Sequence, residues 1–334
     1  MRRSIIPSLT VLSYHRVGPL TVDWSLPHTG AAEFERQVDW LNSRYHVLGA
    51  EELYGILRDG AAFPRRAALI TFDDGYKDNC TNAFPILKAK GIPAIIFLTT
   101  GNIEKRRLFW WDELRYAVRS IYAETKKLNI PIDVGDGMTL DVRRLVHFEN
   151  SLKEVPESVK AKVIAKLIDD YSVDIPSEFV EGQLLTWEEA NAMAEGGMEF
   201  GAHTIDHSIL TRMSLEEARM QISGSKETVE KRVGRKALSF AYPNGTPEDY
   251  NDDIISHLKS SGFVAAFTTQ PLINPAGVDP MRIGRVGTPD DRRIFDLAVS
   301  GFPGDIGKIT AMPSEYIRGG TLASEDERFF RAMS

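Results

Sequence analysis

Two adjacent carboxylates follow directly after a short apolar run. Asp73 and Asp74 come after residues 68–72, and Gly75 follows them. The apolar run favours a strand. Neighbouring side chains point to opposite faces of a strand, but both can reach one site where the chain turns, and glycine permits such a turn. Carboxylates act as general bases and as metal ligands. The pair is therefore either catalytic or an ordinary surface turn.

Two histidines follow a second apolar run. His203 and His207 stand four residues apart, directly after residues 200–202. Imidazoles at this spacing can converge on a metal ion, and a carboxylate from another strand would complete three protein ligands. Histidine pairs also occur as solvated or helix-capping residues. The combination with Asp73 and Asp74 is what favours a metal site.

A third apolar run ends in a turn. Tyr242, Pro243, Asn244 and Gly245 close residues 240–241. A rigid turn at the end of a strand can present a backbone N–H to a developing oxyanion. The alternative is an ordinary Pro-Asn-Gly turn. Three such strand ends in one chain favour a shared site.

The elements that position these residues alternate between apolar runs and amphipathic helices. This alternation is typical of repeated βα units. Seven runs are predicted as strands, at residues 9–14, 67–72, 93–99, 198–202, 237–242, 263–269 and 281–286. We therefore expect an α/β fold, a distorted (β/α) barrel of about seven parallel strands, with the candidate residues at the C-terminal ends of the strands.

Helices are predicted from apolar spacing and from capping residues. Phe34, Val38 and Leu41 share one helical face, and a longer face runs from Leu215 to Val233. Helix starts are expected at the capping boxes of Thr186 with Glu189 and Ser214 with Glu217, and at Thr246-Pro247 and Thr288-Pro289. Residues 103–183 interrupt the βα rhythm with helical patterns near residues 110–118 and 157–171. We expect a barrel domain over residues 1–313 with a helical insertion at about 103–183, and a polar tail at 314–334.

On these motifs the sequence resembles the polysaccharide deacetylase family, from about Leu12 to Val286. The run from Thr71 to Gly75 matches the family's first motif, and the resemblance implies that Asp73 is the catalytic base and Asp74 a metal ligand. It likewise implies metal binding by His203 and His207. Tyr242 and Pro243 match the third motif, which lines the groove and donates a backbone N–H, so Asn244 is included among the expected substrate-binding residues.

The activity implied by this resemblance is hydrolysis of N-linked acetyl groups. The expected substrate is an amino-sugar-containing oligosaccharide, polysaccharide or glycoconjugate, and the expected cofactor is a divalent metal. Zn²⁺ suits two imidazoles and a carboxylate, and the same ligands also suit iron and other divalent ions.

The sequence departs from the family pattern at two positions. The third motif commonly begins with an arginine that orients the base, and Phe240-Ala241 stands there instead. Many members also carry a C-terminal histidine that protonates the leaving amine, and no histidine follows His257. Arg285 is a candidate for orienting Asp73, although its strand could equally turn it to solvent. His15, at the end of the first predicted strand, is a candidate acid, or a rim residue that only shapes the pocket.

Two tryptophans open the insertion. Trp110 and Trp111 could stack on the apolar faces of sugar rings, since aromatic rings suit such contacts. The alternative is that one of them fixes the insertion to the barrel.

Three other functions remain open: hydrolysis of another C–N bond, such as a formamide or a cyclic ureide, ester deacetylation, and carbohydrate binding without turnover. The missing arginine and C-terminal histidine suggest the last of these. The set of Asp73, Asp74, His203 and His207 argues against it, because pure binding would not require those residues.

Composition and charge argue against several classes of binding partner and of cellular location. A formal net charge of −7 argues against nucleic-acid binding. Cys80 is the only cysteine, so no internal disulfide can form. Polar residues and Pro7 interrupt residues 1–13, which fit a signal peptide badly, and no run approaches the ~20 apolar residues of a transmembrane helix. We expect a cytoplasmic protein without a transmembrane segment. No feature of the sequence indicates an oligomeric state.

Overall fold

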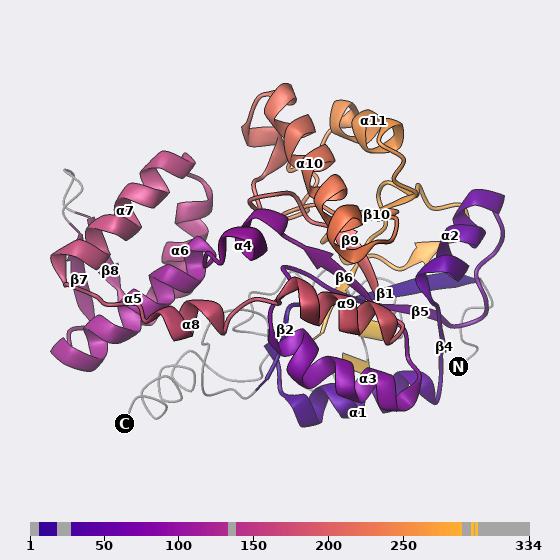
Figure 1. The fold of residues 1–334 in the computed structure, drawn as a ribbon, viewed down its shortest axis with the longest axis horizontal. Helices are drawn as coiled ribbons and strands as arrows, with labels where there is room; N and C mark the ends of the chain where they lie inside the picture. The colour runs from indigo at the N-terminus through magenta and orange to yellow at the C-terminus, as the bar shows by residue number, and fades with distance from the viewer. Residues whose placement is uncertain (1–6, 19–27, 133–137, 289–294, 297, 300–334) are drawn as a thin grey trace. The chain divides into compact units, whose positions relative to one another are not determined.

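The computed structural model describes residues 7–18, 28–132, 138–288, 295–296 and 298–299 (Figure 1). The chain divides into two compact units. The first contains residues 7–18, 28–105 and 184–288 together with the last four described residues, and the second is Arg106–Gln183. The polar tail predicted at 314–334 lies outside the described residues.

The first unit is built on a curled, mostly parallel sheet. Its strands are β1 (Ser8–Tyr14), β4 (His46–Val47), β5 (Ala67–Phe72), β6 (Ile95–Leu98), β9 (Glu199–Ala202), β10 (Ser239–Ala241), β11 (Ala265–Phe267), β12 (Asn274–Pro275) and β13 (Val286–Gly287). The main path runs β11-β10-β9-β6-β5-β1-β12, with β4 beside β5 and β13 beside β1. Every pair from β11 to β1 is parallel, and only β12 is antiparallel. The predicted α/β distorted barrel is confirmed.

The first six predicted strands agree with the structure to within two residues at either end. The two-residue strands β4 and β12 were not predicted, because such short segments carry no periodic pattern. Arg16–Val17 (β2) and His28–Thr29 (β3) form a separate two-stranded sheet.

The seventh predicted strand closes the sheet. Ile283 pairs in parallel with Phe267 at the end of β11, and Val286 in β13 pairs in parallel with Leu12 of β1. One short segment therefore contacts both outer strands of the parallel sheet. Although only Val286–Gly287 forms a regular strand, this segment covers the edge of β11 and the part of β1 that β12 leaves unpaired.

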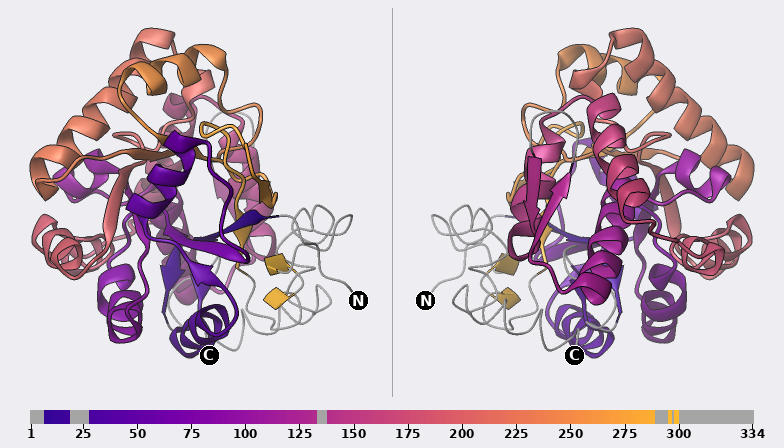
Figure 2. Two further views of the ribbon diagram at one scale, coloured as in Figure 1. Left: turned by 90° about the vertical axis from the view of Figure 1, so that its right-hand side faces the viewer. Right: turned by 90° about the vertical axis from the view of Figure 1, so that its left-hand side faces the viewer.

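Helices surround this sheet; most lie on its outer side, and one covers its apolar interior at the N-terminal ends of the strands (Figures 1 and 2). They are α1 (Ala31–Asn42), α2 (Ala50–Asp59), α3 (Phe84–Lys90), α4 (Thr100–Lys105), α9 (Trp187–Glu195), α10 (Leu215–Val233) and α11 (Asp252–Ser260), with short helical turns at Asn79–Ala83 (η1) and Leu210–Arg212 (η3). The capping boxes at Thr186 and Ser214 are present as predicted.

The helix start predicted at Thr246-Pro247 is wrong. The Asp249 carboxylate accepts hydrogen bonds from the backbone N–H and the hydroxyl of Thr246, at 2.8 and 2.7 Å, and this fixes a turn. Such local bonds compete with helix formation. Helix α11 begins only at Asp252, where the Asn251 side chain accepts from the Ile254 N–H. Pro289 lies outside the described residues.

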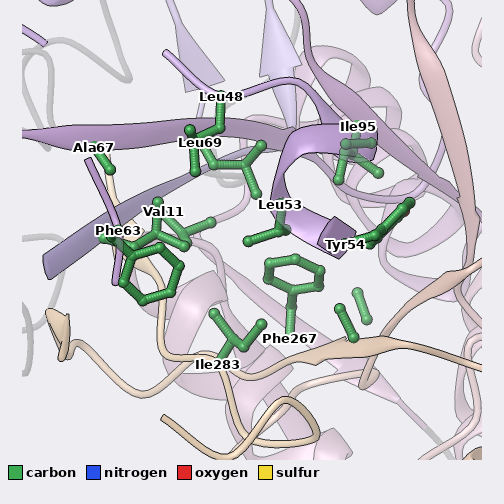
Figure 3. Packing of buried hydrophobic residues seen from close by; sticks show 14 of the residues in the cluster. Val11, Leu48, Leu53, Tyr54, Phe63, Ala67, Leu69, Ile95, Phe267 and Ile283 are labelled. Carbon is green, nitrogen blue, oxygen red and sulfur yellow. The ribbon is translucent and has the colours of Figure 1, made fainter. Parts of the chain in front are cut away.

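The interior of the sheet is apolar at the N-terminal ends of its strands (Figure 3). Side chains alternate between the two faces of a strand, so every second residue points inward. Val11, Leu69 and Phe267 meet Ile283 there, and Leu53 of α2 covers them. On the outer face, Tyr14 and Phe72 pack against Phe34 of α1, with ring centroids 5.0 to 5.8 Å apart.

The second unit has its own core. Its helices are α5 (Trp110–Thr125), α6 (Leu145–Lys153), α7 (Glu157–Asp170) and α8 (Ser177–Glu181), with a short turn η2 (Val142–Arg144). The helical patterns near 110–118 and 157–171 are thus confirmed. The unit also contains an antiparallel pair, β7 (Asn129–Ile132) and β8 (Met138–Asp141), so the expectation of a purely helical insertion is corrected. Ile130 and Leu140 carry this pair's apolar face into the core, a signal too short to separate from a helix.

Within the described part of the chain, no helix is both long and apolar enough to cross a membrane.

Candidate metal centre and catalytic residues

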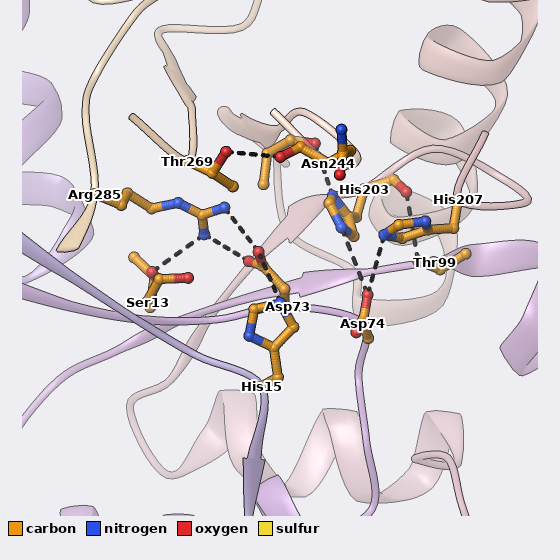
Figure 4. A network of polar contacts seen from close by, with 12 residues as sticks. Ser13, His15, Asp73, Asp74, Thr99, His203, His207, Asn244, Thr269 and Arg285 are labelled. Atoms are coloured by element: carbon orange, nitrogen blue, oxygen red, sulfur yellow. Dashed lines mark hydrogen bonds and ion pairs between the residues drawn. The ribbon is translucent and has the colours of Figure 1, made fainter. Parts of the chain in front are cut away.

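The candidate residues of the first unit lie together at the C-terminal ends of the parallel strands (Figure 4). Asp73 and Asp74 follow β5, His203 follows β9, and His15 follows β1. The Asp73 N–H continues the strand pairing by donating to the Tyr14 carbonyl at 3.0 Å. The predicted gathering of these residues at one end of the barrel is therefore present.

Asp74, His203 and His207 form a group whose ligand atoms all lie within 4.8 Å of one another. The Asp74 Oδ1 atom is 3.6 Å from His203 Nε2 and 3.5 Å from His207 Nε2. Ligand atoms that share a tetrahedral Zn²⁺ at about 2.1 Å lie roughly 3.4 Å apart. Both distances from Asp74 are close to this spacing, so the three side chains suit a divalent metal.

The tautomer of His203 suits metal binding. Its Nδ1 atom lies 2.7 Å from the carbonyl oxygen of Ala241, an acceptor, so Nδ1 carries the proton and Nε2 keeps its lone pair. Burial lowers the pKa of His203 and outweighs the opposing effects of Asp73 and of the Ala241 carbonyl. A neutral imidazole therefore faces Asp74.

Three residues of the site have positive φ angles. They are Asp74 at 73°, His207 at 56° and Asn244 at 62°. Residues other than glycine rarely adopt a positive φ, and such backbone strain is common at functional sites. Gly75 follows at 80°, a φ that residues with a Cβ rarely adopt, so glycine suits this turn. This strain was not predicted from the sequence, because residue types alone do not reveal φ.

Asp73 forms a bidentate ion pair with Arg285. The two guanidinium nitrogens lie 2.6 and 2.7 Å from the two carboxylate oxygens, and both side chains are buried. The Arg285 Nε also donates to the Thr268 carbonyl at 3.0 Å. The predicted contact between Arg285 and the candidate base is therefore present, and the arrangement fixes the plane of the carboxylate.

The register of the closing segment explains why Arg285 points inward. Ile283 packs in the barrel interior, and Arg285 stands two residues later, on the same face of an extended chain. Asp73 stands four residues after Leu69 along β5 and its extension, so these two side chains also share the inward face. The interior thus changes from apolar to charged along the barrel axis, and the two charges meet at its C-terminal end.

The ion pair sets the charge state of the base. Burial by itself raises the pKa of Asp73, but the positive charge of Arg285 opposes it, with further lowering by His203 and His15. The net effect holds the pKa of Asp73 well below its ordinary value. The carboxylate is consequently ionised at neutral pH and can accept a proton.

His15 also lies beside the base. Its Nε2 atom is 3.9 Å from Asp73 Oδ2, and its side chain is 26% exposed. The Asn79 side chain donates to the His15 carbonyl at 2.9 Å, and Asp78 holds the next residues through Arg16 and the Val17 N–H. Asp78 and Asn79 were not predicted as site residues, although they follow Asp73 by only five and six positions. His15 is thus held at the rim in contact with solvent.

The third motif requires a correction. The Tyr242 side chain is buried, its hydroxyl donates to the Met281 carbonyl at 3.0 Å, and its N–H donates to the Phe267 carbonyl at 3.0 Å. Tyr242 is therefore committed to the core and not to a substrate. Pro243 is buried and has no N–H. Among the described residues no hydrogen bond uses the Asn244 N–H, which leaves it as the available donor of this turn.

The two tryptophans belong to the second unit. Trp111 is 8% exposed and stacks on Phe109 with ring centroids 4.5 Å apart, so little of its face is open to a sugar ring. Trp110 is partly buried, and the Lys160 ammonium lies 4.7 Å from its ring centroid. Packing explains both residues, and their role in substrate binding stays a prediction.

Comparison with known proteins agrees with this geometry. The family model described as polysaccharide deacetylase matches residues 60–126 and 152–266. The Bacillus subtilis protein YxkH, named as a candidate polysaccharide deacetylase, is 21% identical over 264 residues, which is 79% of this chain and 65% of the relative. The Escherichia coli (strain K12) poly-β-1,6-N-acetyl-D-glucosamine N-deacetylase is 31% identical over 85 residues, 25% of this chain and 13% of the relative. The chain thus spans less than two thirds of the length of these curated relatives.

Solved structures share the fold. IcaB from Ammonifex degensii aligns with a TM-score of 0.59 and 20% identity, covering 88% of this chain and 96% of that one. The Streptococcus pyogenes deacetylase PplD, solved in complex with acetate, aligns with a TM-score of 0.56 and 18% identity, covering 84% and 92%. At this identity the likeness concerns the fold. Together with the family model, which covers more than half of the sequence, it assigns the chain: this protein belongs to the polysaccharide deacetylase family.

Proposed function

We propose that this protein hydrolyses the N-acetyl group of an amino-sugar-containing carbohydrate. The observation that carries the proposal is the buried Asp73 carboxylate, fixed by Arg285, beside the three-residue group of Asp74, His203 and His207. A charged base next to a metal-ligand set serves the activation of water for hydrolysis.

In the proposed reaction, water adds to the acetyl carbonyl carbon and the C–N bond then breaks, which gives acetate and a free amine. When bound, a divalent cation at Asp74, His203 and His207 supplies a Lewis acid for this chemistry. Asp73 accepts the proton of the attacking water, and Arg285 keeps the carboxylate ionised and oriented. The Asn244 N–H is the backbone donor for the developing oxyanion. His15, 3.9 Å from Asp73, gives a proton to the amine nitrogen.

The substrate class is supported by the relatives. Proteins named poly-β-1,6-N-acetyl-D-glucosamine N-deacetylase from Escherichia coli and Staphylococcus aureus are 31% and 35% identical to this chain over 85 and 72 residues. An N-acetylated hexosamine is therefore the first substrate to test.

The proposed metal is zinc, because two imidazoles and one carboxylate suit Zn²⁺ with positions left open for substrate. Elemental analysis of the purified protein should show about one divalent ion per chain, as one ligand set predicts. His203→Ala and His207→Ala should lose most of this metal. His257→Ala is the control and should keep it, because His257 of α11 forms a hydrogen bond with Ser223 of α10. Full occupancy in both ligand variants would remove the assignment.

The decisive experiment measures acetate released from N-acetylated oligosaccharides, with and without a chelator. Activity should disappear with the chelator and return with added Zn²⁺. Asp73→Asn should keep its metal and lose at least ~10²-fold in rate, the low end for general-base catalysis. An Asp73→Asn protein with a near-normal rate would contradict the mechanism.

The same assay separates the alternatives. An N-formyl sugar, a cyclic ureide and an O-acetyl sugar test hydrolysis of other C–N bonds and of esters. Binding without turnover is disfavoured, because the arginine missing from the third motif has a counterpart in Arg285. Binding of oligosaccharide without release of any acid would restore that alternative.

We also propose a cytoplasmic location, for which the single cysteine, Cys80, is the support. The substrate would then be a biosynthetic intermediate and not finished wall polymer. Cell fractionation that found the protein outside the cytoplasm with a trimmed N-terminus would overturn this.

A further inference from the structure

The chain between the two histidine ligands is a short loop without regular structure. It runs from His203 to His207, and both Thr204 and His207 have positive φ angles, of 64° and 56°. Loop backbone in this region is strained and persists only where its surroundings hold it. The contacts that hold the loop therefore decide where the His207 imidazole stands.

Gln221 of α10 holds the loop from one side. Its Oε1 atom accepts from the N–H of Ile205 at 2.9 Å and from the N–H of Asp206 at 3.0 Å. Its Nε2 atom donates to Asp206 Oδ2 at 3.0 Å. The side chain is only 8% exposed, so few waters can replace these bonds. Because two N–H groups face Oε1, the amide cannot be flipped without setting donors against donors.

Helix α4 holds the loop from the other side. The Gly101 N–H donates to the Ile205 carbonyl at 2.7 Å, and the Thr100 N–H donates to the Thr204 carbonyl at 3.2 Å. The approach is close: a Cβ at Gly101 would lie 2.8 Å from the Ile205 carbonyl oxygen and 2.9 Å from Asp206 Oδ1. The Ile205 N–H is therefore hydrogen-bonded to α10, and the Ile205 carbonyl is hydrogen-bonded to α4.

We propose that Gln221 and Gly101 are positioning residues that set the metal affinity of the site by fixing the 203–207 loop. The inference rests on the proposed metal site. In the described part of the chain, the hydrogen bonds of Gln221 and Gly101 go to Ile205 and Asp206 and not to Asp74, His203 or His207, so both residues act through the loop. A glutamine beside the apolar positions Ala218 and Ile222 of α10 is the sequence signal of this role.

The mechanism is preorganisation. Residues that orient metal ligands without binding the ion typically change metal affinity by ~10- to 100-fold when they are replaced. If the loop relaxes, His207 has to be brought back to its position each time a metal ion binds, which weakens binding. The His203 side is held separately, by the Ala241 carbonyl. The effect should therefore fall on one of the three ligands.

The first experiment removes and then restores the acceptor. Gln221→Met keeps the length of the side chain and removes all three bonds, so Co²⁺ and Zn²⁺ dissociation constants should rise ~10- to 100-fold. Gln221→Glu combined with Asp206→Asn exchanges donor and acceptor, because the new amide can donate to the new carboxylate. This double variant should recover most of the affinity. Binding is measured by competition with a chromophoric chelator, and the visible absorption of bound Co²⁺ reports ligand geometry.

The second experiment uses two helical glycines that both face Ile205. Gly101→Ala pushes on backbone atoms of the loop, so metal affinity should fall. Gly224→Ala in α10 is the matched control, because its Cβ would meet only the end of the Ile205 side chain, at 2.8 Å from Cδ1, and that side chain can rotate. Gly224→Ala should bind metal like the unchanged protein.

The outcomes separate this inference from the proposed function. If the unchanged protein binds no Co²⁺ or Zn²⁺, the metal site itself is wrong. If it binds metal tightly and Gln221→Met and Gly101→Ala bind equally well, the positioning role is wrong and the metal site stands. A Gln221→Met protein that unfolds at lower temperature but keeps its affinity and its Co²⁺ spectrum would likewise limit Gln221 to folding.

Discussion

Asp73 carries a charge in the protein interior, where an unpaired charge destabilises the fold. Removing one partner from a buried ion pair typically costs ~3–5 kcal/mol, because the other charge stays buried and unpaired. Since the folded pKa of Asp73 lies below that of an unfolded carboxyl, about 3.9, its contribution to stability is present above that pH. The contribution is lost as the pH falls toward the folded pKa.

Replacement of Arg285 tests this coupling. In Arg285→Met, burial raises the pKa of Asp73 without the opposing guanidinium, so the base becomes protonated at higher pH. The acid limb of the kcat/KM profile should therefore move upward, and Arg285→Lys should move it less, because one charge remains. Metal content measured across the same pH range separates protonation of Asp73 from loss of the ion. An unshifted limb would show that Arg285 does not control the base.

His15 supports a second residue-scale prediction. If it protonates the leaving amine, His15→Ala should keep its metal and lose ~10²- to 10⁴-fold in rate on an N-acetyl sugar. The alcohol of an activated acetyl ester is a good leaving group even without a proton. The same variant should therefore keep a larger share of its activity on that substrate. Equal losses on both substrates, or loss of metal, would show that His15 only shapes the site.

Residue types and spacing were enough to find most of this site. Asp73, Asp74, His203 and His207 all follow apolar runs, and strand ends in a parallel barrel meet at one edge. The direction of Arg285 was left open, because the sequence of a single strand does not tell which of its faces points into the barrel. It is fixed only by the register that places Ile283 in the core.

Among the elements, the turn after β10 is determined by hydrogen bonds that the sequence does not display. Asp249 accepts from the Asn244 side chain at 2.7 Å, and Thr269 donates to the Asn244 carbonyl at 2.7 Å. These bonds explain why the Pro247 segment forms a turn and not a helix. They also hold Asn244 at a positive φ, with its N–H available.

Substitutions at Asn244 should distinguish its backbone from its side chain. Asn244→Gly keeps the N–H and accepts the positive φ, so kcat should change little. Asn244→Val disfavours that φ and displaces the donor, so kcat should fall by up to ~10²-fold, the lower range for loss of an oxyanion donor. Lys126→Val, at another positive φ of 57° in the second unit, should affect stability alone. Similar kcat values for both Asn244 variants would exclude the backbone donor.

For the whole molecule, the sequence predicted a barrel interrupted by an insertion at about residues 103–183. The second compact unit of the structure contains Arg106–Gln183, and the insertion as a separate domain stays a prediction. The β7–β8 hairpin escaped prediction, because each strand has only four residues and Pro131 stands in the first. Local pattern is weak over such short segments.

Metal removal should destabilise the folded chain. An ion that binds only the folded state stabilises it by about 2.7 kcal/mol when its free concentration is a hundred times Kd. A chelator should therefore lower the unfolding temperature, and added Zn²⁺ should restore it. His203→Ala should show no response to either reagent. An unchanged unfolding temperature in the unmodified protein would argue that the group of Asp74, His203 and His207 holds no ion.

The pairing of residues 283–287 with both β1 and β11 also bears on how the protein is made. Asp73 and Arg285 are 212 positions apart, and synthesis proceeds from the N-terminus. Until residues 283–287 have been synthesised, β11 and the C-terminal part of β1 lack these partners, and Asp73 lacks its counterion. This sheet is therefore completed only after Arg285 has been synthesised, and a fragment that stops before Arg285 should be prone to aggregation at those edges.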